Sequence, residues 1–202
     1  MIKKILVLAT TAISLASAGS LSLDDFSVAQ GPLTNTSSSG ATAIGGGISR
    51  TLSLTSLGGV APIAHKMEVI AGILDMTNGI GDDSVMVLSY DLPLLGVPMG
   101  ATNLQIVLTV VASDGNKSDV VLGGIGAGFA NIPGNTMNVA YNFGIAGPPV
   151  GPGNLSFTFN GDAGWDLAVD SVNLTWSDVP EPSTYAMMGA GLLALALRRR
   201  SS

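Results

Sequence analysis

The chain of 202 residues has no cysteine and a single histidine. The lack of cysteine excludes disulfide scaffolds, thiolate metal sites and cysteine nucleophiles. Charged residues make up 11% of the chain and aromatic residues 5%, whereas 47% are hydrophobic. A typical soluble domain is about 25% charged. The fold must therefore depend on its apolar core, and a metal ion is the other support available to it.

Basic residues are especially scarce between the two ends of the chain. Lys3, Lys4 and Arg198–Arg200 supply five of the eight. The stretch Gly19–Glu181 holds only three basic residues against all 14 acidic ones, which is a net charge of −11. Such a body repels phosphate backbones, so we expect no nucleic-acid partner.

The N-terminal residues have the pattern of a secretory signal peptide. Lys3 and Lys4 form a basic start, Ile5–Ala16 is apolar, and Ala16-Ser17-Ala18 provides small residues for cleavage. We predict a signal helix over residues 1–18, handled by the export machinery, with the mature chain beginning at Gly19. The alternative is an N-terminal helix that packs into the fold.

The C-terminal residues predict a short membrane segment. Tyr185–Leu197 is 13 residues without a charge, which would span about 20 Å as a helix. A bilayer core is about 30 Å thick, so a transmembrane helix over 185–197 is a weak anchor. Arg198–Arg200 would remain on the cytoplasmic side, and Pro180 and Pro182 prevent the helix from extending backward.

This order of features resembles the PEP-CTERM sorting signal, over residues 179–202. The residues that carry the resemblance are Pro180, Glu181, Pro182, Arg198, Arg199 and Arg200. The resemblance implies processing by an exosortase, in bacteria that make exopolysaccharide. The protein would then be membrane-associated before processing, and cell-surface or extracellular afterwards. An ordinary C-terminal anchor is the alternative.

Between the two signals, residues 19–178 predict an all-β domain. Apolar and polar residues alternate in segments such as 50–57, 154–160 and 172–176, as in strands with one buried face. About nine strands follow from this pattern, separated by turns at Asn78-Gly79 and Asp114-Gly115 and by polar loops, of which 34–47 is the longest. We predict a β-sandwich or jelly roll.

The segments "GWDLAVDSVNLTW" and "LDDFSV" resemble the last and first strands of galactose-binding-like jelly rolls, a fold shared by many carbohydrate-binding modules.

Asp170 is the first candidate site residue. It has the strand parity of Val172 and Leu174, which would direct its carboxylate toward the core, where a charge needs a partner or a metal. In the resembled modules the matching aspartate holds a structural Ca²⁺, and Asp24 or Asp25 could join it if the first and last strands pair. The alternative is a solvated carboxylate at the start of a strand.

Trp165 is the candidate ligand-binding residue, because aromatic faces stack on sugar rings and the Gly-rich segment around it favours exposure. Trp176, Tyr90 and Tyr141 are further aromatic candidates, although the parity of Trp176 favours the core.

Catalysis has little support in the sequence. His65 is the only histidine and there is no Gly-x-Ser-x-Gly motif. A Ser-His-Asp set whose members are far apart in the chain stays open.

Three functions remain open. The first is a noncatalytic surface or matrix protein associated with exopolysaccharide, with possible glycan binding as part of that hypothesis. The second is a purely structural coat or biofilm component, and the third is a secreted hydrolase.

Overall fold

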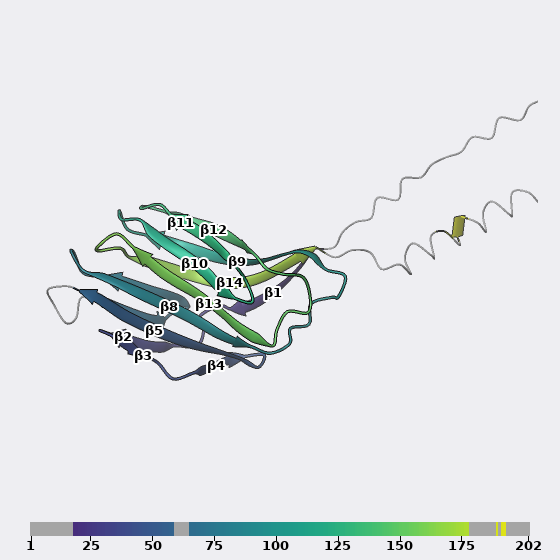
Figure 1. Cartoon of the computed structure of the whole chain (residues 1–202), viewed down its shortest axis with the longest axis horizontal. Helices are drawn as coiled ribbons and strands as arrows, with labels where there is room; N and C mark the ends of the chain where they lie inside the picture. Colours follow the sequence, from purple (N-terminus) through teal and green to yellow (C-terminus); the bar gives the residue numbers. More distant parts are fainter. Residues whose placement is uncertain (1–17, 59–64, 178–188, 190, 193–202) are drawn as a thin grey trace, which may run out of the picture.

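The computed structural model describes residues 18–58, 65–177, 189, 191 and 192 (Figure 1). The predicted signal peptide lies outside the described residues except for Ala18. The predicted membrane helix also lies outside them, except for Gly189, Gly191 and Leu192, whose backbone is helical. Within the described part of the chain, no helix has the length and apolar character needed to cross a membrane.

The described residues form fourteen strands. In chain order they are β1 (Ala18–Asp24), β2 (Gln30–Thr34), β3 (Ser37–Ser38), β4 (Thr42–Gly45), β5 (Ile48–Gly58), β6 (His65–Ile70), β7 (Ile73–Asn78), β8 (Asp83–Leu92), β9 (Thr102–Ser113), β10 (Ser118–Gly124), β11 (Gly128–Ile132), β12 (Met137–Gly144), β13 (Gly153–Gly161) and β14 (Leu167–Ser177).

The strands make two seven-stranded antiparallel sheets that lie face to face (Figure 1). The first sheet has the order β12-β9-β14-β7-β6-β2, and β1 pairs with the C-terminal half of β14 beside β7. The second has the order β11-β10-β13-β8-β5-β3, with β4 also on β5. The predicted all-β sandwich is confirmed.

The strand count exceeds the predicted nine for two reasons. The segment 67–74, which reads as one strand, is a hairpin between β6 and β7. Ala71 and Gly72 both have positive φ, at 53° and 81°, as a tight hairpin turn requires. In addition, β2, β3, β4 and β11 are short and lack an apolar period.

The segment 34–47 was expected to be a polar loop, and this expectation is wrong. It contains β3 and β4, which extend the second sheet along β5. Hydroxyl groups supply the contacts: the Ser39 side chain accepts a hydrogen bond from the Leu52 N–H at 2.9 Å. Such pairing buries little apolar surface, so hydrophobic periodicity does not reveal it.

Alternating side chains of both sheets meet in one apolar core. Leu52 and Leu54 of β5 and Phe157 and Phe159 of β13 are buried. Phe143 of β12 packs edge-on against Phe157, with ring centroids 5.9 Å apart. Close packing of this kind supplies the stability that cysteine pairs would provide elsewhere.

A buried ion pair crosses this core between the sheets. Asp24, at the end of β1, faces Arg50 of β5 with Nη1 2.8 Å from Oδ2. Tyr90 of β8 donates its hydroxyl to the same carboxylate at 3.0 Å. Burial and the neighbouring carboxylate raise the pKa of Tyr90 well above its usual value.

Arg50 uses its remaining donors on the segment that follows β1. Its Nε donates to the Gln30 side chain at 2.7 Å, and its Nη2 donates to the Val28 carbonyl. The guanidinium also lies over the ring of Phe26, 5.6 Å from the ring centroid. One side chain thus holds together β1, β2 and β5, which belong to different sheets.

The two ends of the sandwich differ in composition. Ala18 pairs with Ser177, so the chain enters and leaves the fold at one end (Figure 1). We call it the tail end; its connections are 46–47, 93–101, 125–127 and 145–152. The opposite end, which we call the acidic end, has the connections 79–82, 114–117, 133–136 and 162–166.

The buried ion pair gives a stability prediction. Arg50→Met leaves the Asp24 carboxylate buried without its cation and should lower the free energy of unfolding by about 3–5 kcal/mol. The double variant Asp24→Leu/Arg50→Met should lose less, because no charge remains buried. Urea denaturation measures both values.

The matched control is Lys66→Met, which removes ion pairs with Glu68 and Asp75 made by a lysine side chain that is 38% exposed. Loss of each surface pair should cost less than about 1 kcal/mol. An Arg50→Met effect no larger than that of Lys66→Met would show that the buried pair does not hold the sheets together.

Candidate functional site

Trp165 lies in the core, so its predicted role as an exposed sugar-stacking residue is wrong. Its exposed fraction is 0%. The ring packs on Gly161, where an added Cβ would lie 2.8 Å from it. The glycines around Trp165 therefore allow the backbone to approach the indole ring. Tyr90 is buried as well, whereas Trp176 and Tyr141 are half-buried.

Asp170 is exposed, and its predicted inward orientation is also wrong. The register between β14 and β9 shifts at this point: Val169 pairs with Val110, but Ser171 pairs with Thr109. Asp170 is the extra residue of a β-bulge. The bulge changes the parity, so Val169 and Val172 both face the core while Asp170 does not.

The predicted calcium ligands do not converge. Asp24 points into the sandwich and is paired with Arg50, whereas Asp170 is exposed. Asp25 is exposed too, and it accepts hydrogen bonds from the backbone and hydroxyl of Ser27 at 3.1 and 2.6 Å, which lower its pKa. No group of three metal-ligating side chains occurs among the residues that the structure describes. Calcium binding stays a prediction without a ligand set there.

His65 belongs to a chain of polar side chains near the acidic end. Its Nε2 lies 3.0 Å from the Ser56 hydroxyl, and its Nδ1 lies 2.8 Å from Asn78 Oδ1. Asn78 Nδ2 donates to the Trp165 carbonyl at 3.0 Å, which fixes the amide orientation. Asn78 Oδ1 must therefore accept from His65, and Nδ1 carries the proton. The Nε2 lone pair then faces the Ser56 hydroxyl.

Asp166 completes this chain. Its carboxylate accepts the backbone N–H of Asn78 at 2.7 Å. Burial raises its pKa above 3.8, the Asn78 hydrogen bond lowers it, and the nearby charges of Asp114 and Asp75 raise it further. The net effect is a raised pKa, so the Asp166 carboxyl keeps its proton at a higher pH in the folded protein than in the unfolded chain.

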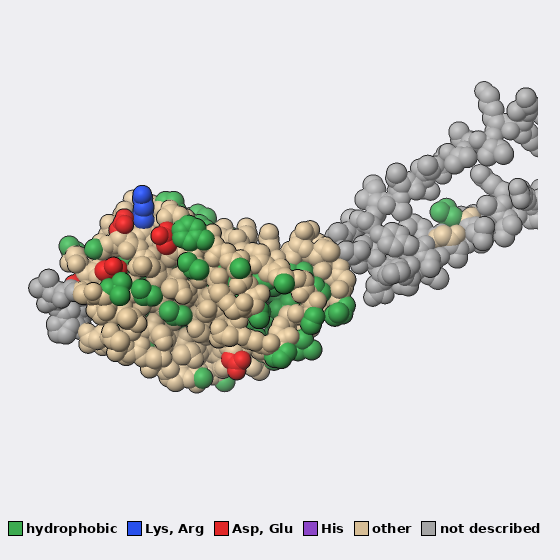
Figure 2. Space-filling view, viewed as in Figure 1, with side chains coloured by type: hydrophobic (Ala, Val, Ile, Leu, Met, Phe, Trp, Pro, Cys, Tyr) green, Lys and Arg blue, Asp and Glu red, His purple; other side chains and the backbone are tan. Residues whose placement is uncertain are grey.

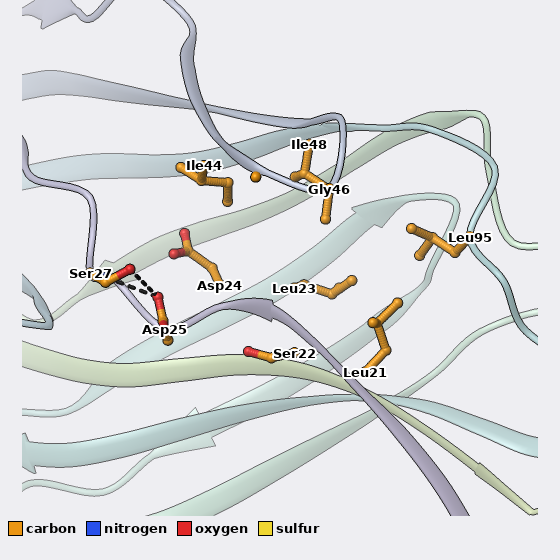
Figure 3. Close-up of a pocket in the computed structure, with 11 residues that line it drawn as sticks. Leu21, Ser22, Leu23, Asp24, Asp25, Ser27, Ile44, Gly46, Ile48 and Leu95 are labelled. Atoms are coloured by element: carbon orange, nitrogen blue, oxygen red, sulfur yellow. Dashed lines mark hydrogen bonds between the residues drawn. The ribbon is translucent and has the colours of Figure 1, made fainter.

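One groove lies between β1 and the β4–β5 turn (Figure 3). It has a volume of about 330 Å³ and an apolar lining that includes Leu21, Ile44 and Leu95. Figure 3 shows Asp25 bonded to Ser27 at its edge. The lining has no aromatic side chain, and its buried carboxylate, Asp24, is already paired. This groove therefore offers few free polar groups to a ligand.

A second groove of about 360 Å³ lies at the tail end, where β1, β9 and β14 meet. Its lining consists of Ala18, Gly19, Ser20, Asn103, Gln105, Thr175, Trp176 and Ser177. A Cβ on Gly19 would lie 2.3 Å from the Trp176 ring, so only glycine permits this contact. We call this the Trp176 groove. It combines an aromatic ring with amide and hydroxyl groups and has no charged side chain.

The outer face of the first sheet, whose side chains have the opposite strand parity to Trp176, presents uncharged polar groups. Gln105 pairs with Thr175, which pairs with Ser20. The next row places Asn173 opposite Ser22, and Asn173 donates to the Ser171 hydroxyl at 3.2 Å. These rows present amides and hydroxyls, which both donate and accept hydrogen bonds and carry no net charge.

The C-terminal residues decide how the protein is sorted. Residues 178–200 match the PEP-CTERM protein-sorting motif. The motif indicates export, with a membrane-anchored precursor that an exosortase processes. The predicted residues Pro180, Glu181 and Pro182 and the arginines 198–200 fall within the matched range, and all lie outside the described residues.

Solved structures similar to the body include three carbohydrate-binding modules. One is TmCBM61 in complex with β-1,4-galactotriose, with 13% identity, a TM-score of 0.34, and coverage of 63% of this chain and 88% of that one. A family 29 carbohydrate-binding module has 10% identity, a TM-score of 0.32, and coverage of 61% and 88%. The family 11 module of the cellulosomal cellulase Lic26A-Cel5E of Clostridium thermocellum has 13% identity, a TM-score of 0.32, and coverage of 82% and 98%. No curated protein matches the chain.

Sequence reasoning ranked Trp165 above Trp176 and did not find the groove. Trp176 lies at the end of β14, where the register with β9 shifts again. The pairing of Gly19 with Trp176 would have been a usable signal, because glycine in a terminal strand indicates a close approach. The partners of His65 were out of reach, since Asn78 and Ser56 come from other strands.

The raised pKa of Asp166 predicts a pH-dependent stability difference. Asp166→Asn keeps an acceptor for the Asn78 N–H but no longer titrates. The contribution of Asp166 to the stability of the wild type should fall as the pH rises from 3.8 through the raised pKa, because the native carboxyl holds its proton longer. The variant should therefore become relatively more stable over this range, by less than about 1 kcal/mol at a half-exposed site.

Thermal melts from acidic to neutral pH measure this difference, with Asp91→Asn as a control at an exposed carboxyl. A difference in melting temperature between Asp166→Asn and the wild type that stays constant with pH would contradict the prediction.

Proposed function

We propose that this chain is an exported, noncatalytic protein of the cell surface or extracellular matrix that binds a neutral glycan of exopolysaccharide. The sorting motif supports the export and anchoring part. The observation that carries the binding part is the Trp176 groove, whose lining includes the half-buried indole of Trp176 and the amides of Asn103 and Gln105. After processing, this surface faces the matrix.

The groove chemistry fits a polyol better than it fits an ion. A sugar ring presents apolar C–H faces, which stack on an aromatic ring, and hydroxyls, which both donate and accept. Gln105, Thr175 and Ser20 form one row across three strands, so a ligand lying along it meets successive partners. None of the side chains that line this groove, among the described residues, carries a charge, which suits a ligand bound through hydroxyl groups.

The second hypothesis, a purely structural coat component, makes a different prediction for the same surface. A coat protein needs no specific ligand, so the groove would bind no sugar. A glycan array therefore separates these two functions.

The glycan proposal predicts binding that depends on Trp176. Loss of the ring in Trp176→Ala should weaken binding at least about tenfold, as expected for a central aromatic contact. The measurement is a glycan array with the processed protein, followed by titration of the best ligand. Gln105→Ala should have a smaller effect, because a single hydrogen bond contributes about 1 kcal/mol.

Phe129→Ala is the matched control, because it removes an aromatic ring that is 64% exposed on β11, in the other sheet. Glycan binding should be unchanged. A flat array with the wild type, or equal losses in Trp176→Ala and Phe129→Ala, would favour the coat component.

The hydrolase hypothesis is favoured by one observation, the Ser56–His65–Asn78 chain. Its two distances and its tautomer are those that a serine nucleophile needs: the Nε2 lone pair can take the hydroxyl proton while Asn78 holds Nδ1. Ser56 is half-buried. Neither groove described above includes Ser56 or His65. The chain therefore also fits a structural role as the partner of a buried histidine.

A fluorophosphonate probe distinguishes the two roles of Ser56. An activated Ser56 would attack phosphorus and displace fluoride, with its proton passing to His65, and the adduct would disappear in Ser56→Ala. The control Ser53→Ala removes another half-buried hydroxyl on the same strand, which donates to the Ser38 hydroxyl and has no histidine partner among the described residues. The noncatalytic proposal predicts no adduct by mass spectrometry, and an adduct on Ser56 would replace it with the hydrolase.

A further inference from the structure

The tail end of the sandwich has no charged residue in its connections. The segments 46–47, 93–101, 125–127 and 145–152 contain no Asp, Glu, Lys or Arg. They pack on one another: the Leu95 N–H donates to the Val150 carbonyl at 2.9 Å, and Gly126 bridges Ile145. The charge nearest to them in sequence is Asp91, two residues before Pro93. These described connections are therefore uncharged themselves, and the exposed carboxylates of Asp25 and Asp91 lie beside them.

Large apolar side chains project from these connections. Leu94 is 62% exposed and Met99 is 76% exposed. Figure 2 shows hydrophobic side chains gathered at the end of the body from which the chain continues. Exposed apolar groups that lie together in this way mark a surface that contacts a partner.

Apolar exposure alone does not separate the two ends, because Ile80 and Met137 are also exposed toward the acidic end. The difference is charge. Two connections of the acidic end meet where the Gly164 N–H donates to the Asp82 carbonyl at 2.8 Å. The carboxylates in its four connections are those of Asp82, Asp114, Asp162 and Asp166. Transfer of such groups into an apolar layer is costly.

The length of chain beyond Ser177 brings the tail end close to the membrane. Seven residues, 178–184, separate Ser177 from the uncharged stretch Tyr185–Leu197. Even fully extended they reach at most about 25 Å. In the membrane-anchored precursor, the body is therefore held near the bilayer, and the end held closest is the one with uncharged connections.

Electrostatics favours the same orientation. The described body is strongly acidic, and membrane surfaces that contain anionic lipids repel carboxylates. The acidic end should therefore point away from such a surface, while Leu94 and Met99 can enter the boundary between headgroups and acyl chains, where amphipathic surfaces bind.

We propose that, in the precursor, the tail end rests on the lipid bilayer through the 93–101 connection, with Leu94 and Met99 in contact with lipid. This contact rests on the anchoring part of the proposed function and adds an orientation to it: the first sheet stands upright on the membrane, with the acidic end outward.

The chain has no cysteine, so single cysteines can carry an environment-sensitive nitrobenzoxadiazole label. Gly96 lies between Leu94 and Met99, and Gly115 lies at the acidic end. Both glycines have open space around an added Cβ and no positive φ. Gly96→Cys and Gly115→Cys are therefore a matched pair of probes.

The chain ending at Ser202 is exported in a host without an exosortase, purified from its membranes, and reconstituted into vesicles of phosphatidylethanolamine and phosphatidylglycerol. The label at position 96 should show a blue shift and brighter emission than in the vesicle-free protein, and the label at 115 should not change. Leu94→Asn/Met99→Asn in the Gly96→Cys background should abolish the shift while the chain still floats with the vesicles.

Each other result overturns the proposal in a recognisable way. An unchanged label at 96 on a chain that floats would show anchoring without contact. Equal shifts at 96 and 115 would exclude the orientation. A shift at 96 that fades when the chain is diluted among vesicles would identify a second copy as the partner. Failure to float would refute the anchoring itself, and with it that part of the proposed function.

Discussion

The ion pair between Asp24 and Arg50 connects the two sheets of a protein that has few other strong contacts available. With no cysteine and 11% charged residues, the sandwich depends on apolar packing, which is not directional. The hydrogen bonds that Arg50 donates are directional, so they fix the positions of the groups that accept them. They fix the end of β1, the Val28 carbonyl and Gln30 against β5, and β1 pairs with the C-terminal half of β14. That pairing brings Ala18 and Ser177 to one end of the fold.

The period-two pattern predicted the sandwich and most of its long strands, because each has one buried face. The pattern failed where pairing does not bury apolar surface, as in β3 and β4, and where the parity changes inside a strand. Asp170 shows the second case: one bulge residue turned the predicted metal ligand outward. A bulge depends on the register of the neighbouring strand, which a single sequence does not specify.

The C-terminal signal was easier to predict than the site, because processing enzymes read linear sequence, and the N-terminal signal peptide stays a prediction. The motif match over 178–200 confirms the C-terminal one. The site instead depends on contacts between distant strands. Trp165 lies in a Gly-rich segment and Trp176 in an alternating strand, yet the first packs on Gly161 inside the core and the second lies half-buried over Gly19 at the edge of the core. The deciding contact lies about 160 positions away in sequence for Trp176, so local pattern could not rank the two residues correctly.

The separation of charge along the molecule connects these features. Strands run between an end whose connections are uncharged and an acidic end, and the chain leaves at the former because β14 is the last strand and runs toward it. A tail attached at the acidic end would hold carboxylates against an anionic membrane surface, which disfavours anchoring. The Trp176 groove also lies at the tail end, beside Ser177. If both proposals hold, the same end of the sandwich lies next to lipid while the tail is attached and becomes accessible to a glycan once the body is released.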